Sequence, residues 1–311
     1  MKALVLGGGV VGVTTAYFLA RAGHEVTVVE ANDALGLEAS AGNAGIIAPG
    51  HSFAWASPRA PAMLLRSLRG DETAIRLRLT PDPHLYTWGL RFLRECVPAR
   101  ARRNTLVKLR LCQYSQRVMN ELVQAEGLEY QAVARGALYL YRDPAELEAG
   151  IKKMKLLAEH GQKQEILDAS RVAGLDPAFA PVQGKIAGAI RDLGDSSGDS
   201  RLFTEGLGAL CRARLGVTVK LGSRVTALRA SADRIDGVVT GDGVLTADRY
   251  VLALGVGSAP VARTAGVSLP IYPAKGFPRR FRSRRVAWRP AFPAWTSSGW
   301  SAGRGWVTGC A

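Results

Sequence analysis

The chain has 311 residues, of which 47% are hydrophobic and 22% charged, as in folded proteins with one large core or two smaller ones. No stretch approaches the roughly 20 apolar residues that cross a bilayer. The formal net charge is +15, and seven arginines after Pro278 supply almost half of it. Because no aromatic residues alternate with the basic ones, a nucleic-acid-binding protein is disfavoured.

The first residues run into glycines without a cleavage site, so we predict a cytoplasmic protein. Its basic surplus is interpreted as a solvated face, and docking on the inner face of the cytoplasmic membrane stays open as the alternative. The cysteines have neither metal-ligand nor redox-pair spacing, which predicts unreactive thiols and no metal site. They are Cys96, Cys112, Cys211 and Cys310.

The N-terminal residues predict a strand, a helix and a second strand. Residues 2–6 are apolar, residues 11–22 are amphipathic, and residues 25–30 are rich in β-branched side chains. Such a βαβ unit in about 30 residues is typical of a parallel sheet with a crossover helix.

The turn between the first strand and the helix has the pattern Gly7-x-Gly9-x-x-Gly12. Gly7 permits a tight turn, Gly9 lets a pyrophosphate approach the backbone, and Gly12 lets the helix pack closely on the strand. The helix N-terminus offers N–H groups to phosphates. Glu30 ends the second strand and suits a ribose hydroxyl, so we predict a dinucleotide site that disfavours the 2′-phosphate of NADP.

Later segments alternate between helical and extended patterns. Residues 38–58 are rich in small residues and predict a loop, and residues 61–160 are mainly helical around a strand-like stretch at 136–142. Residues 185–195 predict a strand, and Asp199 predicts the N-cap of a helix over 200–216. Strands follow at 217–221, 224–230, 234–240 and 249–255.

The choice between FAD and NAD depends on the rest of the chain. The small-residue loop with Ser40, Asn43 and Gly45 can return to the cofactor, and a distant strand ends in Ala253-Leu254-Gly255. A helical insert of more than a hundred residues interrupts the nucleotide fold, which then resumes. This discontinuous layout favours FAD.

Several stretches together resemble the bacterial D-amino acid dehydrogenase small subunits, within the D-amino acid oxidase family of FAD-dependent oxidoreductases. They are VLGGGVVGVTTAYFLARAGHEVTVVE, EASAGNAGIIAPG with AWASP, DSSGDSRLFTEGL, YVLALG and PIYPAKG. The resemblance runs through Gly276 and is closer to the dehydrogenases than to sarcosine or glycine oxidases.

The resemblance implies an α/β fold with a discontinuous, Rossmann-like FAD-binding domain at 1–60 and 195–270. An inserted α+β substrate domain is expected at 61–194 and 271–278. The resemblance also implies a set of FAD contacts, with Val225 facing the adenine through its backbone. That set is Gly7, Gly9, Gly12, Glu30, Ser40, Asn43, Gly45, Val225, Ala253, Leu254 and Gly255.

The implied reaction is oxidative deamination of a D-amino acid such as D-alanine. Hydride passes from the substrate Cα to flavin N5, and electrons go on to a respiratory quinone or electron carrier. No catalytic residue is assigned, and His51, Trp55 and Tyr272 are open candidates near the flavin. The alternatives are an oxygen-using oxidase of the glycine or sarcosine type and a non-catalytic nucleotide-binding remnant.

Residues 279–311 depart from the family. They contain no acidic residue and four of the six tryptophans, with many residues that have GC-rich codons. We therefore predict a C-terminal truncation by a frameshift just after Gly276, which leaves the fold incomplete and the activity impaired. The alternative is a genuine basic tail without a fixed structure.

Overall fold

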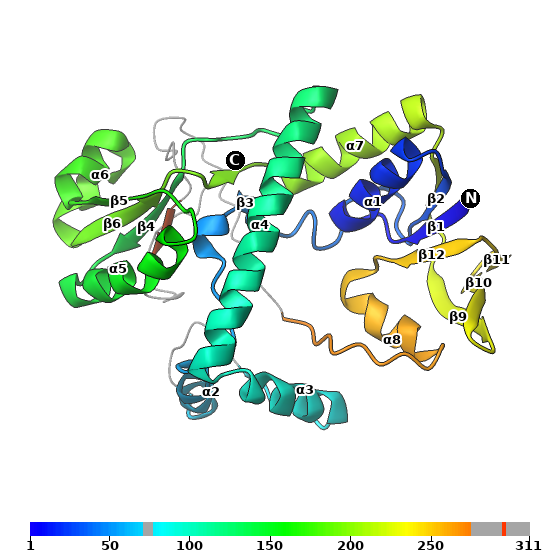
Figure 1. Ribbon diagram of the computed structural model, residues 1–311, viewed down its shortest axis with the longest axis horizontal. Helices are drawn as coiled ribbons and strands as arrows, with labels where there is room; N and C mark the ends of the chain where they lie inside the picture. Colours follow the sequence, from blue (N-terminus) through cyan, green and yellow to red (C-terminus); the bar gives the residue numbers. More distant parts are fainter. Residues whose placement is uncertain (71–76, 275–293, 297–311) are drawn as a thin grey trace. The chain divides into compact units, whose positions relative to one another are not determined.

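The computed structural model describes residues 1–70, 77–274 and 294–296, and in the last range only the backbone. The chain divides into two compact units, coloured by sequence in Figure 1. Unit 1 comprises Met1–Asn43, Glu126–Gln131 and Asp199–Pro278, and unit 2 comprises Ala44–Ala125, Ala132–Gly198 and Arg279–Ala311. The domain boundaries expected from the sequence stay a prediction.

Unit 1 contains a four-stranded parallel sheet in the order β12–β1–β2–β8. Its strands are β1 (Lys2–Leu6), β2 (Glu25–Val29), β8 (Thr218–Lys220) and β12 (Arg249–Leu252). Helix α1 (Val10–Arg21) connects β1 with β2 and lies beside α7 (Ser200–Leu215), as Figure 1 shows. The βαβ unit predicted from the sequence is therefore present.

A second, antiparallel sheet of unit 1 packs against the parallel one. It consists of β9 (Val225–Ser231), β10 (Arg234–Thr240) and β11 (Gly243–Leu245). The turn η3 (Gly255–Gly257) and helix α8 (Ser258–Arg263) follow β12. Leu4, Leu6 and Val29 share one buried cluster with Val225 and Val238, so alternate residues of the parallel strands hold the two sheets together.

Unit 2 contains a mixed sheet in the order β13–β4–β6–β5. Its strands are β4 (Ala137–Tyr141), β5 (Gln164–Leu167), β6 (Gly188–Asp192) and β13 (Ala294–Thr296). Tyr139 and Tyr141 face α5 (Pro144–Ala158), whereas Leu138 and Leu140 face α6 (Ala169–Leu175) and η2 (Pro177–Lys185). Both faces are covered, which explains why all of β4 is apolar and buried.

The remaining elements of unit 2 are mostly helical. They are β3 (Ile46–Ile47), which pairs with β7 (Ser196–Ser197), η1 (Pro49–His51), α2 (Ala60–Leu68), α3 (Pro83–Arg94) and α4 (Pro98–Glu126). The carboxylate of Asp82 accepts from His84 N at the start of α3, and that of Asp143 accepts from Ala145 N and Glu146 N at the start of α5. Pro follows each cap, as at many helix starts.

The structure confirms most of the expected elements and adds several short ones, among them β5, α6 and α8. The mainly helical stretch expected at 61–160 contains α3, α4 and α5, and Asp199 caps α7 by accepting from Arg201 N and Leu202 N. Strand β5 and helix α8 were missed because each is short, with 4 and 6 residues. Such lengths give too few repeats for a period to be recognised. The predicted frameshifted tail lies outside the described residues except for β13.

Candidate functional site

The carboxyl ends of three parallel strands bring the predicted cofactor segments together. Gly7 follows β1 and donates from its N–H to Val29 O at 2.8 Å, and Ala253 follows β12 and donates to Leu6 O at 2.8 Å. Glu30 follows β2 and donates to Lys220 O at 2.8 Å. In open α/β sheets, ligands bind outside the carboxyl ends of the strands, so this edge is where a nucleotide site is expected.

Two of the three motif glycines occupy positions that no other residue fits. Gly7 has φ +113°, and a Cβ there would overlap the carbonyl oxygen of Ala253. A Cβ on Gly12 would overlap the carbonyl oxygen of Gly7, so α1 could not pack against the turn. At Gly9 a Cβ would approach Ser40 Oγ to 3.3 Å. Because glycine has no Cβ, the backbone at the start of the helix stays open to a ligand.

A side chain from the loop after β2 contacts the N-terminus of α1. Gly9 is the N-cap and supplies no side-chain hydrogen bond, and the first turn holds no acidic residue. Ser40 Oγ accepts from Val10 N at 2.9 Å, so the predicted loop does return to the glycine turn. The positive end of the helix dipole is consequently not neutralised by a carboxylate of its own first turn.

Glu30 is buried, and donors on both sides fix its carboxylate. Oε2 accepts from Gly8 N at 2.6 Å, and Oε1 accepts from Asn32 N at 2.8 Å and from Asn32 Nδ2 at 2.7 Å. Each carboxylate oxygen can accept two hydrogen bonds, so Oε2 keeps a lone pair for a ribose hydroxyl. The orientation of this carboxylate is set before any ligand arrives.

The other predicted contacts lie around this edge or in the neighbouring loop. Asn43 Nδ2 donates to Ala39 O at 3.0 Å and to Ser40 O at 2.7 Å, which closes the loop of unit 1. Val225 begins β9 and is buried in the core between the two sheets. Gly45, with φ +63°, belongs to unit 2, where its carbonyl accepts from Gly198 N at 2.8 Å.

The three candidates for catalysis do not share one unit. His51 and Trp55 belong to unit 2 and Tyr272 to unit 1. The His51 ring stacks on Tyr139, with centroids 5.4 Å apart. Desolvation, reinforced by the charges of Lys153 and Lys108, lowers the pKa of His51 to about 4, so its imidazole is neutral at pH 7.

Beneath His51 lies an acidic pair that sequence reasoning missed. Tyr139 Oη donates to Asp195 Oδ2 at 2.5 Å, and Gly50 N donates to Asp195 Oδ1 at 2.8 Å. Burial and the neighbouring charge of Asp192 raise the pKa of Asp195 to about 7. The signal available in the sequence was two aspartates three residues apart, one at the end of a predicted strand and one just beyond it.

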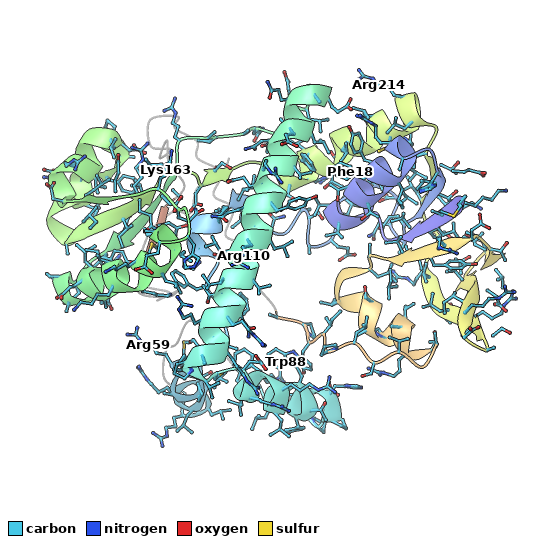
Figure 2. All side chains as sticks on the ribbon, in the orientation of Figure 1. Phe18, Arg59, Trp88, Arg110, Lys163 and Arg214 are labelled. Atoms are coloured by element: carbon cyan, nitrogen blue, oxygen red, sulfur yellow. The ribbon has the colours of Figure 1, made fainter. Side chains whose placement is uncertain are left out.

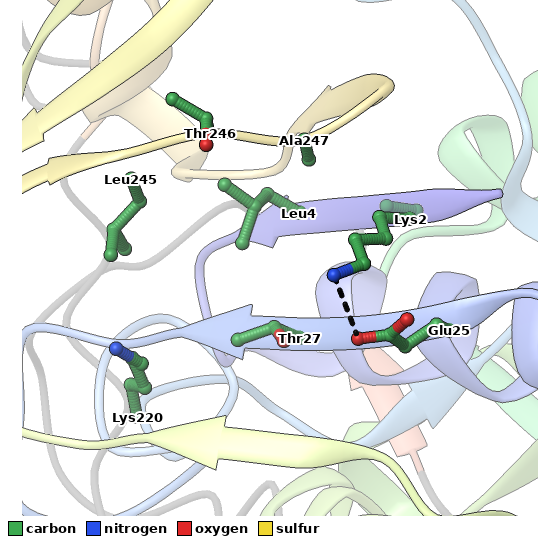
Figure 3. Close-up of a pocket in the computed structure, with 9 residues that line it drawn as sticks. Lys2, Leu4, Glu25, Thr27, Lys220, Leu245, Thr246 and Ala247 are labelled. Atoms are coloured by element: carbon green, nitrogen blue, oxygen red, sulfur yellow. Dashed lines mark ion pairs between the residues drawn. The ribbon is translucent and has the colours of Figure 1, made fainter.

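A separate hollow of about 200 Å³ lies in unit 1 (Figure 3). Lys2 and Glu25 form its exposed end, where Lys2 Nζ lies 3.8 Å from Glu25 Oε1, and Leu4 and Leu245 form its apolar wall. Exposed ion pairs contribute little binding energy, and small-molecule pockets usually measure about 300–1,000 Å³. The hollow is therefore a packing gap, not the nucleotide site.

The described cysteines show no reactive site. Cys96, Cys112 and Cys211 are free, and burial raises the pKa of each thiol, to about 11 for Cys211. Within the described ranges no group of three or more His, Cys, Asp or Glu side chains could hold a metal ion. Cys310 lies outside those ranges.

The residues at this edge fit the ADP part of a dinucleotide. The N-terminus of α1, which has no acidic residue in its first turn, suits a pyrophosphate, because N–H groups and the helix dipole both attract anions there. The buried carboxylate of Glu30 suits a ribose, and the glycine turn leaves room for a close backbone approach. The fit covers the ADP end of FAD, for which this chain has groups suited to the phosphates and to the ribose.

Comparison with known proteins identifies the class to which this edge and fold belong. Residues 2–301 match the family described as "DAO: FAD dependent oxidoreductase". The chain belongs to this family of FAD-dependent oxidoreductases. FAD is the cofactor of the family, so the predicted family, α/β fold class and cofactor are confirmed.

Among curated relatives, the chain is 42% identical over 277 residues to "D-amino acid dehydrogenase 2" of Mesorhizobium japonicum, covering 89% of this chain and 67% of that protein. It is also 42% identical over 278 residues to "D-amino acid dehydrogenase" of Methylobacterium nodulans, covering 89% and 66%. The chain thus spans about two thirds of the length of the curated relatives it matches.

Solved structures agree on the fold. Glycine oxidase from Geobacillus kaustophilus superposes with a TM-score of 0.61 at 19% identity, covering 86% of this chain and 58% of that one. L-proline dehydrogenase from P. horikoshii gives a TM-score of 0.56 at 18% identity, covering 86% and 56%. These matches show that the chain shares the fold of these proteins and say nothing about its substrate.

Proposed function

We propose that this chain carries the FAD-binding and substrate-domain segments of a D-amino acid dehydrogenase. The observation that supports the proposal most strongly is the 42% identity to curated D-amino acid dehydrogenases over 89% of the chain. The ADP cradle with Glu30 supports the same reading from the structure. The proposed reaction converts a D-amino acid and water to a 2-oxo acid and ammonia.

Bound FAD would supply the acceptor for the hydride that leaves the substrate Cα, and would pass the two electrons to a quinone or electron carrier. The described residues would then serve to bind and orient. Glu30 would accept from a ribose hydroxyl, the N-terminus of α1 would face the pyrophosphate, and the turn at Ala253 would border the same site. Hydride transfer needs orientation more than acid–base groups, which agrees with the scarcity of catalytic candidates.

The remaining predicted contacts enter the proposal as positions along the cofactor. Ser40, Asn43 and Gly45 would follow the pyrophosphate toward the flavin, and Leu254 and Gly255 would complete the turn after β12. Val225 would contact the adenine through its backbone. His51, Trp55 and Tyr272 stay candidates for the substrate side, where His51 would act as a neutral imidazole because its pKa is lowered to about 4.

An anaerobic titration tests the proposed reaction. The full chain is loaded with FAD, D-alanine is added without oxygen, and the visible absorbance of the flavin is followed. Bleaching by D-alanine but not by L-alanine is the expected result. A flavin that binds but is bleached by neither enantiomer would leave only the nucleotide-binding remnant.

The electron acceptor separates the dehydrogenase from the oxidase alternative. Reoxidation by a soluble quinone analogue, with little hydrogen peroxide in air, is the expected result. Rapid peroxide formation from glycine, sarcosine or a D-amino acid would instead favour an oxidase. Electron transfer to a respiratory acceptor would bring the chain to a membrane surface, so contact with such a surface is part of this proposal. No helix among the described residues is long and apolar enough to cross a membrane.

A further inference from the structure

A group of basic side chains in unit 2 gathers around Phe53. Lys153 of α5 places Nζ 4.0 Å from the centre of the Phe53 ring, and Lys108 of α4 donates from Nζ to Phe53 O at 3.2 Å. Desolvation and the charge of Arg59, which precedes α2 and is labelled in Figure 2, lower the pKa of Lys153. We call Arg59, Lys108, Lys153 and the neighbouring His51 the basic cluster.

The three cations of the basic cluster lack acidic partners. Within residues 1–70 and 77–274, none of them forms an ion pair. Desolvation and the charges of Lys153 and Lys108 together lower the pKa of His51, so both cations act on the same ring. All four side chains are exposed, and a ligand can therefore reach them from solvent. Because like charges repel, an anion that enters the cluster relieves a repulsion that the described groups do not offset.

The acidic pair Asp192 and Asp195 is enclosed by the protein and does not balance these charges. Asp195 is buried, and its two oxygens accept from Gly50 N and Tyr139 Oη. Asp192 is buried as well and accepts from Gln162 Nε2 at 3.2 Å. Burial raises the pKa of both carboxyl groups. Neither carboxylate is therefore open to a positively charged group that arrives from solvent.

We infer that the basic cluster binds the carboxylate of a small 2-oxo acid that the proposed reaction releases. The identity of this anion rests on the proposed function, whereas its charge follows from the cluster alone. Lys153 and Lys108 would donate to the carboxylate, since charge-assisted hydrogen bonds are about twice as strong as neutral ones. The rings of His51 and Phe53, with centroids 6.1 Å apart, would border the apolar part of the ligand.

The charge of the ligand selects the product of the proposed reaction over its substrate. A D-amino acid carries an ammonium group next to its carboxylate, so cations that attract the carboxylate repel the ammonium group. Deamination removes the ammonium group and leaves a 2-oxo acid with a carboxylate alone. Because Asp192 and Asp195 are enclosed, they offer the ammonium group no compensation. The basic cluster should therefore hold the 2-oxo acid more tightly than the amino acid.

Ligand-observed NMR on the full chain tests the inference and needs neither flavin nor turnover. Pyruvate, D-alanine and the uncharged pyruvamide are titrated separately, and saturation transfer gives a dissociation constant for each. Pyruvate is expected to bind at least about tenfold more tightly than either of the others, because it alone carries a net negative charge. Added salt should weaken the binding of pyruvate, since it screens exposed charges.

Matched variants assign the binding to residues. Lys153→Met and Lys108→Met should each lower the affinity for pyruvate about tenfold, because each removes a charged donor and keeps an apolar stem. Lys153→Arg should retain most of the affinity. Lys152→Met is the control: it removes the same charge from the adjacent position of α5, where Lys152 Nζ pairs with Glu148 Oε1 at 2.6 Å. This variant should bind pyruvate as the wild type does.

Circular dichroism melting confirms that each variant is folded before it is compared. Equal losses of affinity in Lys152→Met and Lys153→Met would mean that only the net charge of the chain matters, and would overturn the inference. Pyruvate that binds no more tightly than pyruvamide or D-alanine would overturn it as well, whatever the variants do.

The result is independent of the test of the proposed reaction. Bleaching of the flavin by D-alanine without binding of pyruvate to the basic cluster would keep the reaction and remove this site. Binding of pyruvate that depends on Lys153, without bleaching by D-alanine, would keep the anion site and remove the reaction.

Discussion

At the scale of single residues, the carboxylate of Glu30 does two jobs that a substitution can separate. It accepts backbone N–H groups from Gly8 and Asn32, and it is the group proposed to bind the ribose. Removing its charge therefore affects both the folded state and the ligand. The geometry shows that Glu30 is held by the protein itself.

Glu30→Gln should destabilise the fold and weaken FAD binding. An amide nitrogen cannot accept from Gly8 N, and an unsatisfied buried donor costs about 1–3 kcal/mol. Urea denaturation measures the stability loss, and quenching of FAD fluorescence measures binding. Glu25→Gln, which changes an exposed ion pair with Lys2, serves as the control and should alter neither. Unchanged FAD affinity in Glu30→Gln would remove the ribose from the proposal.

Asp195 makes the stability of unit 2 depend on pH. Its pKa is raised to about 7 by burial and by Asp192, whereas an aspartate in the unfolded chain has a pKa of about 4. Between these values the folded state holds a proton that the unfolded state releases. The stabilisation from Asp195 is thus complete below pH about 4 and is lost as the pH rises through about 7.

Asp195→Asn should flatten this dependence. The neutral amide resembles the protonated acid, so the variant should gain stability relative to the wild type between about pH 5 and pH 8. Urea midpoints across that range give the measurement. Asp236→Asn, at an exposed ion pair with Arg229, is the control and should keep the wild-type slope. A parallel pair of curves for Asp195→Asn and wild type would show that Asp195 is ionised when folded.

At the scale of elements, helix α7 shows how local sequence decides a boundary. Asp199 accepts from the N–H groups of Arg201 and Leu202, and Gly216 ends the helix with φ +66°. Both signals are readable in the sequence, because a carboxylate at the start and a glycine at the end satisfy groups that every helix leaves unpaired.

Asp199→Ala should cost about 1 kcal/mol of unfolding free energy through loss of this cap. Chemical denaturation measures the change, and Asp199→Asn or Asp199→Ser should restore most of it, since both side chains can accept the same bonds. A loss as large in those two variants as in Asp199→Ala would mean that the charge of Asp199, not its capping, stabilises the fold.

The sequence predicts helices and strands well where a hydrophobic period repeats. It predicts contacts between residues poorly where segments distant in the sequence meet. The glycine turn, Glu30 and the turn at Ala253 were anticipated, because strand ends of a parallel sheet gather at one edge. The sequence predicts that the loop with Ser40 returns to the cofactor site, but it does not predict the particular contact of Ser40 with Val10. The pair Asp192 and Asp195 was missed, because its burial depends on Gly50 and Tyr139 from two other segments.

At the scale of the whole molecule, the groups proposed to bind the cofactor are concentrated at its ADP end. The groups proposed to bind phosphate and ribose lie at the ends of β1 and β2 and at the start of α1, all within unit 1. Among the described strands, β12 pairs with β1 alone, and the chain spans about two thirds of its curated relatives.

The chain should therefore bind ADP nearly as well as FAD. Competition of ADP against FAD fluorescence quenching is expected to give affinities within about tenfold, since roughly 1.4 kcal/mol separates each factor of ten. The flavin content of purified protein should be well below one per chain. An FAD affinity a hundredfold above that of ADP, with full occupancy after dialysis, would contradict this expectation.

The strand order of the parallel sheet determines how late in synthesis unit 1 can be completed. Strand β1 pairs with β12, and Lys2 N donates to Asp248 Oδ2, 246 residues further along the chain. At about 5–20 residues per second, synthesis of the intervening chain takes roughly 10–50 s. During most of that time the apolar β1 and β2 exist without either outer neighbour, while the segments of unit 2 are synthesised. The nucleotide cradle, although encoded first, is thus among the last parts of the molecule to be completed.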